Sequence, residues 1–410
     1  MSDGWTSAPV ADCIISVSVA GKSKIQTRDY KPSGRFPIID QGHEQIAGWT
    51  DDDTAVIDSP LPLIVFGDHT RAFKFVDAPF ARGADGTQLL RPKSNIDVLF
   101  FFYACRAIDL PARGYSRHFS VLKEKDVAFP IDGYEQKAIA RVLRQTDSAV
   151  TQQSELLQTL RELKHATMQQ LFAHGLRGEA QKETEIGLMP YSWNPKFILE
   201  LCDIWSGGTP RKSVAEYWVG DIPWVSGKDL KLPALENAID HISQAGVEAG
   251  SRIAPKGAVL LLVRGMGLAK DLPVAVIKRP MAFNQDVKAL VTRGQYSGEF
   301  LRSAIYAGKD RLLSQIVPSA HGTMTLNLND VESFKVACPS DKNEANQVVI
   351  MTDALERKIA LHQQKKLVLD ELFRSLLNKL MTGEISVEDL DLSALTHEEP
   401  QPQTEAEVQS

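Results

Sequence analysis

Two long helical runs with matched beginnings constrain this chain more than any other feature. The stretches "PIDGYEQ" (130–136) and "PSDKNEA" (339–345) share the spelling P-x-D-x-x-E. An Asp just before a helix accepts a hydrogen bond from the backbone of the first turn, and a Glu three residues later reaches back in a capping box. The predicted caps are Asp132 with Glu135 and Asp341 with Glu344.

The two runs also end alike. "MQQLFAHGLRGE" (168–179) closes the first and "LLNKLMTGE" (376–384) closes the second, so Gly175 and Gly383 predict the C-terminal stops. Roughly 39 residues without Pro or Gly lie between start and stop, which gives each helix a length of about 58 Å. Matched caps, lengths and ends indicate an internal repeat.

Each helix carries one apolar stripe that steps by three and four residues, as in the seam of a coiled coil. Each stripe needs a partner, and the other helix is the obvious candidate. In the second helix His362 and Lys366 interrupt the stripe; they either lie at a frayed edge or fix the register as buried polar residues. The predicted seam residues are Leu143, Val150, Leu157, Leu160, Leu355, Ile359, Leu369, Phe373 and Leu376.

The segments before the two helices echo each other in the same order. "LPLIVFG" (61–67) corresponds to "VLLLVRG" (259–265), and "YKPSGRFPII" (30–39) corresponds to "YWVGDIPWV" (217–225). Their apolar stretches are short, β-branched or aromatic, and interrupted by Gly, Pro and Asp, which predicts mixed α+β modules with a largely β core. The predicted division is a first module at 1–130, its helix at 131–176, a second module at 177–339, its helix at 340–383 and an acidic tail at 384–410.

Charge is spread unevenly along the chain. The net charge is −6, but the tail from Glu384 onward holds eight acidic and no basic side chains, so the remainder stands at +2. A near-neutral body permits DNA binding through local basic patches. The Pro, Gln and Glu content of the tail is typical of disorder. No apolar run approaches the roughly 20 residues of a membrane helix, which predicts a cytoplasmic protein.

A search for catalytic motifs yields only weak matches. "SVSVAGKS" (16–23) has Ser16 where a phosphate loop needs its first Gly, and "NPKF" (194–197) has Lys196 in place of the second Pro of the N-P-P-[FYW] loop of amino-methyltransferases. The four cysteines form no CxxC pair and the nine histidines show no ligand spacing, so we expect neither a metal site nor catalytic residues here. The pattern favours binding over catalysis.

Three stretches carry a resemblance to a known family. "TEIGLMPYSW", "SGGTPRKSVAEYWVGDIPWVSGKDL" and the helix ending "MQQLFAHGLRGE" are similar to the DNA-specificity (S) subunit of type I restriction-modification systems. The resemblance covers the chain up to about Glu384, because the repeat order is the family's order of recognition domain, helix, second recognition domain and second helix. The first half is more divergent and lacks the "G-G-T-P" loop.

The resemblance implies an α+β fold with two tandem pseudo-symmetric target-recognition domains, whose long helices form an antiparallel coiled coil. Each domain would read one half of a bipartite double-stranded DNA target, and the helices would set the unread spacer. The resemblance also implies two methyltransferase (M) subunits as partners, often joined by endonuclease (R) subunits. S-adenosylmethionine, ATP and magnesium would belong to those partners, while this non-catalytic chain would direct adenine methylation and restriction.

Recognition of bases and phosphates would come from polar and basic side chains in the loops of the modules. In the second module the candidate DNA-binding residues are Thr209, Arg211, Lys212, Lys228, Arg264, His321 and Thr323. In the first module they are Arg35, Gln41, His43, His69, Arg71 and Arg117.

Two other classes of function remain open from the sequence. One is a coiled-coil scaffold that binds protein alone, which salt-dependent DNA affinity would exclude. The other is a stand-alone DNA-modifying enzyme, which would be active on DNA without a partner.

Overall fold

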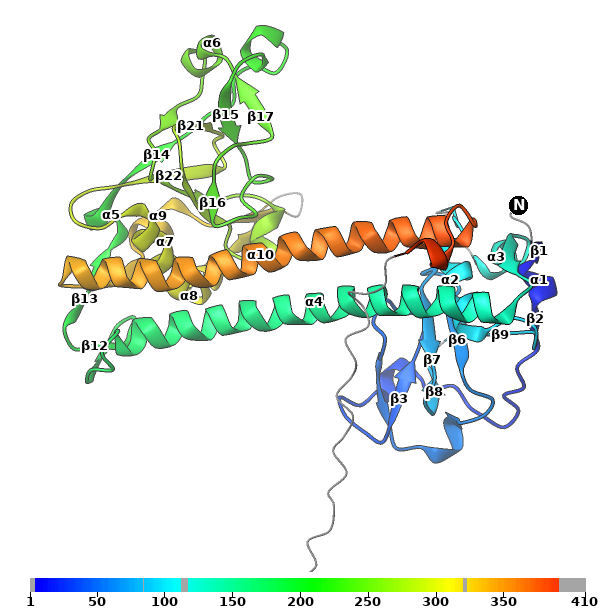
Figure 1. Cartoon of the computed structure of the whole chain (residues 1–410). Helices are drawn as coiled ribbons and strands as arrows, with labels where there is room; N and C mark the ends of the chain where they lie inside the picture. Colours follow the sequence, from blue (N-terminus) through cyan, green and yellow to red (C-terminus); the bar gives the residue numbers. More distant parts are fainter. Residues whose placement is uncertain (1–3, 84, 112–116, 320–322, 391–410) are drawn as a thin grey trace, which may run out of the picture. The chain divides into compact units, whose positions relative to one another are not determined.

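The computed structural model describes residues 4–83, 85–111, 117–319 and 323–390. The chain divides into two compact units: unit 1 comprises residues 1–154 and 365–410, and unit 2 comprises residues 155–364. Each of the two long helices, α4 (Gly133–His174) and α10 (Lys342–Met381), contributes one part to each unit. The fold is mixed α+β, as the sequence predicts (Figure 1).

The strands of unit 1 form two four-stranded sheets and one separate pair. The inner sheet has the order β2 (Ile14–Ile15), β9 (Thr87–Pro92), β6 (Leu63–Gly67), β7 (Phe73–Val76). The outer sheet has the order β4 (Gly48–Thr50), β3 (Phe36–Ile39), β8 (Phe80–Arg82), β5 (Val56–Ile57), with β3 and β8 parallel. The separate pair is β1 (Trp5–Pro9) with β10 (Asp126–Pro130). The short helices are α1 (Val10–Cys13), α2 (Val98–Ala107) and α3 (Phe119–Lys123).

Unit 2 has the same plan with longer connections. Its inner sheet has the order β14 (Cys202–Ser206), β22 (Val287–Thr292), β19 (Val259–Leu262), β20 (Val274–Ile277), β16 (Ala234–Leu235). Its outer sheet has the order β17 (Asp240–Ile242), β15 (Ile222–Val225), β21 (Met281–Phe283), β18 (Ile253–Ala254), with β15 and β21 parallel. The separate pair is β13 (Trp193–Phe197) with β25 (Lys335–Pro339). Two hairpins complete the strands: β11 (Gln181–Thr184) with β12 (Gly187–Pro190), and β23 (Val317–Pro318) with β24 (Met324–Thr325).

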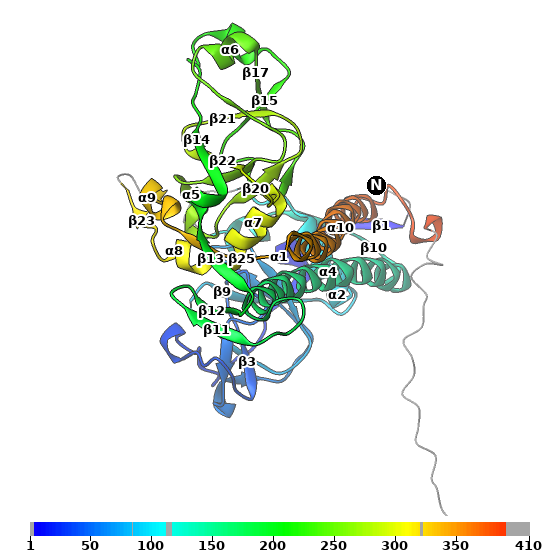
Figure 2. The same ribbon diagram turned by 90° about the vertical axis from the view of Figure 1, so that its left-hand side faces the viewer.

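The strand orders of the two units correspond one to one, apart from the additional β16. In each unit the outer sheet lies farther from the long helices than the inner sheet does (Figures 1 and 2). The remaining helices of unit 2 are α5 (Ile198–Leu201), α6 (Gln244–Glu248), α7 (Gly298–Ala307), α8 (Lys309–Leu313) and α9 (Leu328–Glu332). Helix α7 packs on β19, β20 and β22 with one face and on α10 with the other, and this layer holds the core of the unit.

The predicted starts and stops of the long helices are confirmed. The Asp132 carboxylate accepts a hydrogen bond from the backbone N–H of Tyr134 (2.9 Å), and the Asp341 carboxylate accepts one from Asn343 (2.8 Å). Both are N-cap bonds that satisfy a donor of the first turn. Gly175 has φ +67° and Gly383 has φ +66°, a left-handed conformation that favours glycine at a helix end.

The predicted capping boxes are wrong. The Glu135 carboxylate accepts a hydrogen bond from the indole N–H of Trp5 (3.2 Å) rather than from its own cap backbone. Oε1 of Glu344 is buried and has no hydrogen-bond partner within the described part of the chain. The Trp5 indole of β1 engages Glu135, and Glu344 is buried, so tertiary structure overrides the local capping preference at both helix starts.

The seam residues lie on the covered face of their helices. Leu361 and Leu367, which lie off the seam, are 68% and 59% exposed. Lys366 is half-buried and donates to Asp370 one turn later (2.7 Å), so its charge is paired on its own helix. The buried seam residues are Leu143, Leu157, Leu160 and Phe373. The half-buried ones are Val150, Leu355, Ile359, Leu369 and Leu376.

Neither weak catalytic motif adopts the structure its chemistry needs. Residues 16–19, after β2, have no regular structure, and no helix follows residue 23 in the manner of a phosphate loop. Residues 194–197 form most of strand β13 and pair with β25. In the part of the chain that the structure describes, no helix is both long and apolar enough to cross a membrane.

Candidate nucleic-acid interface

In unit 2 several polar loops converge on the short segment Phe283–Asp286, which begins at the last residue of outer strand β21. The backbone N–H of Gly208 donates to the Phe283 carbonyl (2.9 Å), and the N–H of Asn284 donates to the Val225 carbonyl (2.9 Å). The N–H of Val263 donates to the Asp286 carbonyl (2.8 Å). These three bonds draw together the loops that carry Thr209–Lys212, Lys228 and Arg264.

A fourth loop joins this cluster through strand β24. Arg264 forms a β-bridge with Thr325, and the N–H of Gly265 donates to the Met324 carbonyl (2.9 Å). Thr323 begins this loop, and its hydroxyl lies 2.6 Å from that of Ser319. The structure therefore brings together the predicted residues of the second module, except His321, which lies outside the described residues.

The basic side chains of this cluster differ in whether a carboxylate already pairs with them. Arg211, Lys212 and Arg264 are exposed, and no ion pair involves them in the part of the chain that the structure describes. Lys228 instead pairs with Asp240 (2.7 Å), and this hydrogen bond raises the pKa of Lys228. The three unpaired cations are thus better suited to DNA phosphates than Lys228 is.

In unit 1 the corresponding cluster forms around Asp68, which is 4% exposed and follows β6. The N–H of Asp68 donates to the Gly86 carbonyl (2.7 Å), and its own carbonyl accepts from the N–H of His118 (3.0 Å). The N–H of the next residue, His69, donates to Oε1 of Gln41 (3.4 Å). Gln41 and His69 therefore meet, and Arg117 is placed beside them through its neighbour His118.

Two further predicted residues of the first module lie at the rim of a polar cavity of about 680 Å³, which His43, Thr70 and Arg71 help to line. Arg71 has φ +63° and donates to the Leu110 carbonyl (2.6 Å), so its guanidinium is held by the protein backbone. His43 is exposed beside it.

Arg35 is the predicted residue that the structure does not bring into this cluster. It precedes β3, whereas Gln41 follows the other end of that strand. Its guanidinium pairs with Asp53 (3.0 Å) and stacks over Phe36 at 5.0 Å. An exposed arginine that already has a carboxylate partner is a weaker candidate for a phosphate contact.

Sequence reasoning missed the residues that directly follow the outer strands. Asn284 and Gln285 lie in the convergent segment of unit 2, and the Thr209 hydroxyl donates to Oε1 of Gln285 (2.7 Å). In unit 1, Asp40 directly follows β3 and pairs with Lys74 of β7 (3.6 Å), which is 3% exposed and whose pKa is lowered by burial. The signal for the first two was the polar triplet in "MAFNQDV", between two apolar strands.

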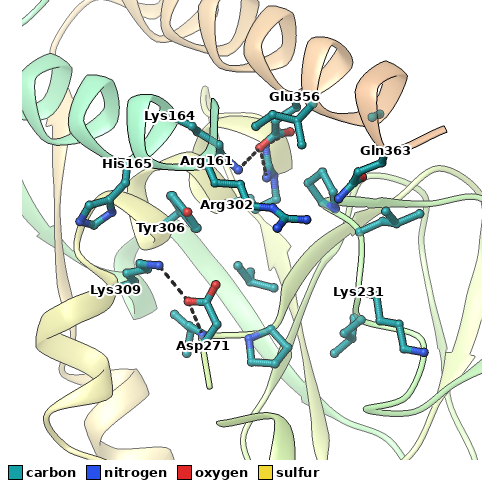
Figure 3. Close-up of a pocket in the computed structure, with 18 of the residues that line it drawn as sticks. Arg161, Lys164, His165, Lys231, Asp271, Arg302, Tyr306, Lys309, Glu356 and Gln363 are labelled. Carbon is teal, nitrogen blue, oxygen red and sulfur yellow. Dashed lines mark hydrogen bonds and ion pairs between the residues drawn. The ribbon is translucent and has the colours of Figure 1, made fainter. Parts of the chain in front are cut away.

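A cavity of about 610 Å³ in unit 2 lies among α7, the loop after η4 (Met266–Ala269) and the parts of the long helices that belong to this unit (Figure 3). The Glu356 carboxylate accepts from both terminal nitrogens of Arg302 (2.6 and 2.7 Å) and pairs with Lys164 (2.7 Å). Lys309 pairs with Asp271 (2.9 Å). Burial lowers the pKa of Lys164. Through Arg302 of α7, Lys164 of α4 and Glu356 of α10, these ion pairs join three helices within the unit.

The chemistry of the cysteines is limited by burial. All four thiols are buried and free. Burial raises the pKa of Cys202 and of Cys338 to about 12, and it also raises the pKa of Cys13 and of Cys105. Such thiols stay protonated near neutral pH and are poor nucleophiles. Among the described residues, no group of three or more His, Cys, Asp or Glu side chains is arranged to hold a metal ion.

Known proteins that are similar to this chain are specificity subunits of type I restriction enzymes. Residues 190–371 match the family model of the type I restriction modification DNA specificity domain. The chain is 24% identical over 365 residues to the EcoR124I/EcoR124II specificity subunit of Escherichia coli, across 84% of this chain and 88% of that protein. It is 28% identical over 216 residues to the MjaIX specificity subunit of Methanocaldococcus jannaschii, across 50% of this chain and 48% of that protein.

The chain is similar to type I specificity subunits over most of its length. The crystal structure of the type I restriction-modification S subunit from M. genitalium resembles this chain with a TM-score of 0.61 at 17% identity, over 92% of this chain and 96% of that one. That likeness shows a shared fold. The family match spans most of the second module and most of α10, the half in which the sequence resemblance is also strongest.

Proposed function

We propose that this chain reads a bipartite double-stranded DNA sequence as the specificity subunit of a type I restriction-modification complex. The observation that carries the proposal is the correspondence between the two units. Each unit builds the same strand order and gathers polar and basic loops beside the parallel pair of its outer sheet. Two similar readers in one chain fit a target with two separate halves.

In this proposal residues 1–130 and 177–339 are the target-recognition domains, and residues 131–176 and 340–383 are the helices that space them. The helices run antiparallel as a coiled coil, and the chain is pseudo-symmetric. Contacts inside each unit support this arrangement. In unit 2, Lys164 near the end of α4 pairs with Glu356 near the start of α10; in unit 1, Leu143 near the start of α4 shares a core with Leu380 at the end of α10.

In this proposal the chain recognises the DNA sequence, and partner subunits catalyse the reactions. We propose two M subunits, which carry S-adenosylmethionine and methylate an adenine in each half, and R subunits that use ATP and magnesium. The relatives' names as specificity subunits of restriction enzymes support a multisubunit complex. Methylation of a base inside a duplex requires a deep pocket for the flipped base, which such partner subunits would provide.

The test is an exchange of one recognition domain. The chain is produced with its M partner, and methylated adenines are mapped by single-molecule sequencing. Replacing residues 1–130 with the corresponding segment of the E. coli relative should change one half of the methylated sequence and leave the other half intact. A matched exchange of residues 177–339 should change only the opposite half.

Two results would contradict the proposal. Absence of any defined methylated sequence with the unmodified chain would refute a specificity role. A change of both halves after either single exchange would refute the assignment of one reader to each half.

A further inference from the structure

Each unit places a glutamine at the same end of the parallel strand pair in its outer sheet. In unit 1 the parallel pair ends with Ile39 opposite Arg82, and Gln41 lies two residues beyond Ile39. In unit 2 it ends with Val225 opposite Phe283, and Gln285 lies two residues beyond Phe283. Because parallel strands end at one edge of a sheet, the two glutamines occupy corresponding edges, although different strands of the pair carry them.

Both amides are anchored through the oxygen. Oε1 of Gln41 accepts from the backbone N–H of His69 (3.4 Å), and Oε1 of Gln285 accepts from the Thr209 hydroxyl (2.7 Å). The Gln41 amide also lies against Gly86, where an added Cβ would be 2.5 Å from Oε1 and would push the amide aside. The anchors limit the rotamer freedom that a reading side chain would otherwise lose on binding.

An amide anchored in this way presents a defined pattern of hydrogen-bond donors and acceptors. Oε1 keeps a second lone pair as an acceptor, and Nε2 remains a double donor. Adenine presents a matching pair in the major groove, the N6 donor beside the N7 acceptor, whereas guanine presents two acceptors. A backbone N–H only donates, so His69 fixes which end of the Gln41 amide is the oxygen. A hydroxyl both donates and accepts, so Thr209 holds the Gln285 amide in place with less control over its orientation.

We propose that Gln41 and Gln285 are specificity-determining residues, each reading one adenine in the half-site of its own module. This inference rests on the proposed function and adds to it the residues and the base that they read. Arg264, Arg211 and Lys212 contact phosphates around Gln285, because they are exposed, cationic and carried by the same loop cluster.

The test uses isosteric charge substitutions in the complex of the full chain with its M subunit. Gln285→Glu keeps an oxygen for Thr209 but replaces the outward donor with an acceptor, a pattern suited to the N4 donor of cytosine. In a randomised duplex library, we expect one position of the second half-site to change from adenine towards cytosine. Gln285→Ala should lower the preference for adenine at that position roughly tenfold to a hundredfold. Gln41→Glu and Gln41→Ala should act in the same way on the first half-site.

Matched controls come from exposed glutamines outside the clusters. Gln244→Glu in α6 and Gln145→Glu in α4 change the charge equally and should leave both half-sites unaltered. An unchanged sequence preference in both Gln285 variants would overturn the inference for unit 2 while leaving the proposed function intact. A uniform loss over all positions would also overturn it, because it would indicate a structural role. A wild-type complex without any sequence preference would instead refute the proposed function itself.

Discussion

The two units join their modules to the long helices at the same helix positions but with different chemistry. Asp147 in α4 and Glu356 in α10 each lie 14 residues after the first residue of their helix, Gly133 and Lys342. In unit 1 Asp147 pairs with Arg106 of α2 (2.6 Å), and that guanidinium also lies over the Phe373 ring at 4.9 Å. In unit 2 Glu356 instead holds the two cations Arg302 and Lys164.

The third member of each joint also occupies a corresponding position. Lys164 and Phe373 each lie 31 residues after the start of their helix. One position therefore supplies an aromatic face to a cation in unit 1 and a cation to a carboxylate in unit 2. The repeated backbone fold places the ion-pair cluster at the same helix positions in both units. The side chains at those positions differ, so the charges are paired differently.

The side chains of the unit 2 joint are more deeply buried than those of the unit 1 joint. The side chains of Arg302, Glu356 and Lys164 are 4%, 11% and 12% exposed, whereas those of Arg106 and Asp147 are both 28% exposed. A buried charge cluster contributes little net stability, but removal of one member leaves the others uncompensated. Unit 2 should therefore be much more sensitive to the loss of its carboxylate than unit 1.

The largest expected effect comes from Glu356→Gln. It leaves Arg302 and Lys164 buried without an anionic partner, which should lower the free energy of unfolding by about 3–5 kcal/mol. The matched variant Asp147→Asn should cost about 1 kcal/mol, because Arg106 retains solvent and the Phe373 ring. Urea denaturation followed by circular dichroism measures both. Equal losses would show that burial does not distinguish the joints.

The helix caps should behave alike in the two units, in contrast to the joints. Asp132→Ala and Asp341→Ala each remove one bond to the first turn, at 2.9 and 2.8 Å. Each variant should lose about 1 kcal/mol of stability. Thermal and urea unfolding of the two variants would measure the difference. A gap of more than about 1 kcal/mol would mean that one cap also has a tertiary role.

The two joints should also differ in pH dependence, because a lysine with a shifted pKa lies in the unit 2 joint. The pKa of Lys164 is lowered from its ordinary value of 10.5, mainly by burial. Between the lowered pKa and 10.5 the unfolded chain keeps a proton that the folded chain has released, so stability rises with pH across that window. Across this window the free energy of unfolding of the wild type, relative to Lys164→Met, should rise by up to about 1.4 kcal/mol for each unit by which the pKa of Lys164 is lowered.

Measuring this difference cancels groups that both proteins share, including the buried thiols of Cys202 and Cys338. Phe373→Met is the matched variant in unit 1, and its stability relative to the wild type should show no such trend, because phenylalanine does not titrate. A flat difference for Lys164→Met between pH 8 and 10.5 would contradict the lowered pKa.

Local signals were sufficient for the ends of the helices and for their covered faces. Asp132, Asp341, Gly175 and Gly383 act through the backbone within one turn, so the sequence alone predicts them. The partner of Glu135 was mispredicted, because the indole of Trp5 comes from a strand 130 residues earlier in the chain. A bond between such distant residues depends on the packing of strand against helix.

The candidate interface was predicted in part. Basic residues in glycine-containing stretches, such as Arg264 and Arg211, stood out as loop residues and lie in the cluster. Gln285 did not stand out, because an amide between two strands has no sequence signature until its neighbour Thr209 is brought 2.7 Å away. Arg35 looked equally suitable in the sequence, and only the fold reveals that Asp53 already pairs with it.

An internal repeat, two long capped helices, a β-rich module before each helix and a resemblance to type I specificity subunits could all be predicted from the sequence. Those features depend on periodicity, caps and composition, which are local properties. The tertiary structure alone decided which loops converge on residues 283–286, which charges are neutralised, and how corresponding helix positions form unlike joints. These depend on distances of a few ångströms between residues far apart in the chain, and hydrogen bonds and ion pairs form only at such distances.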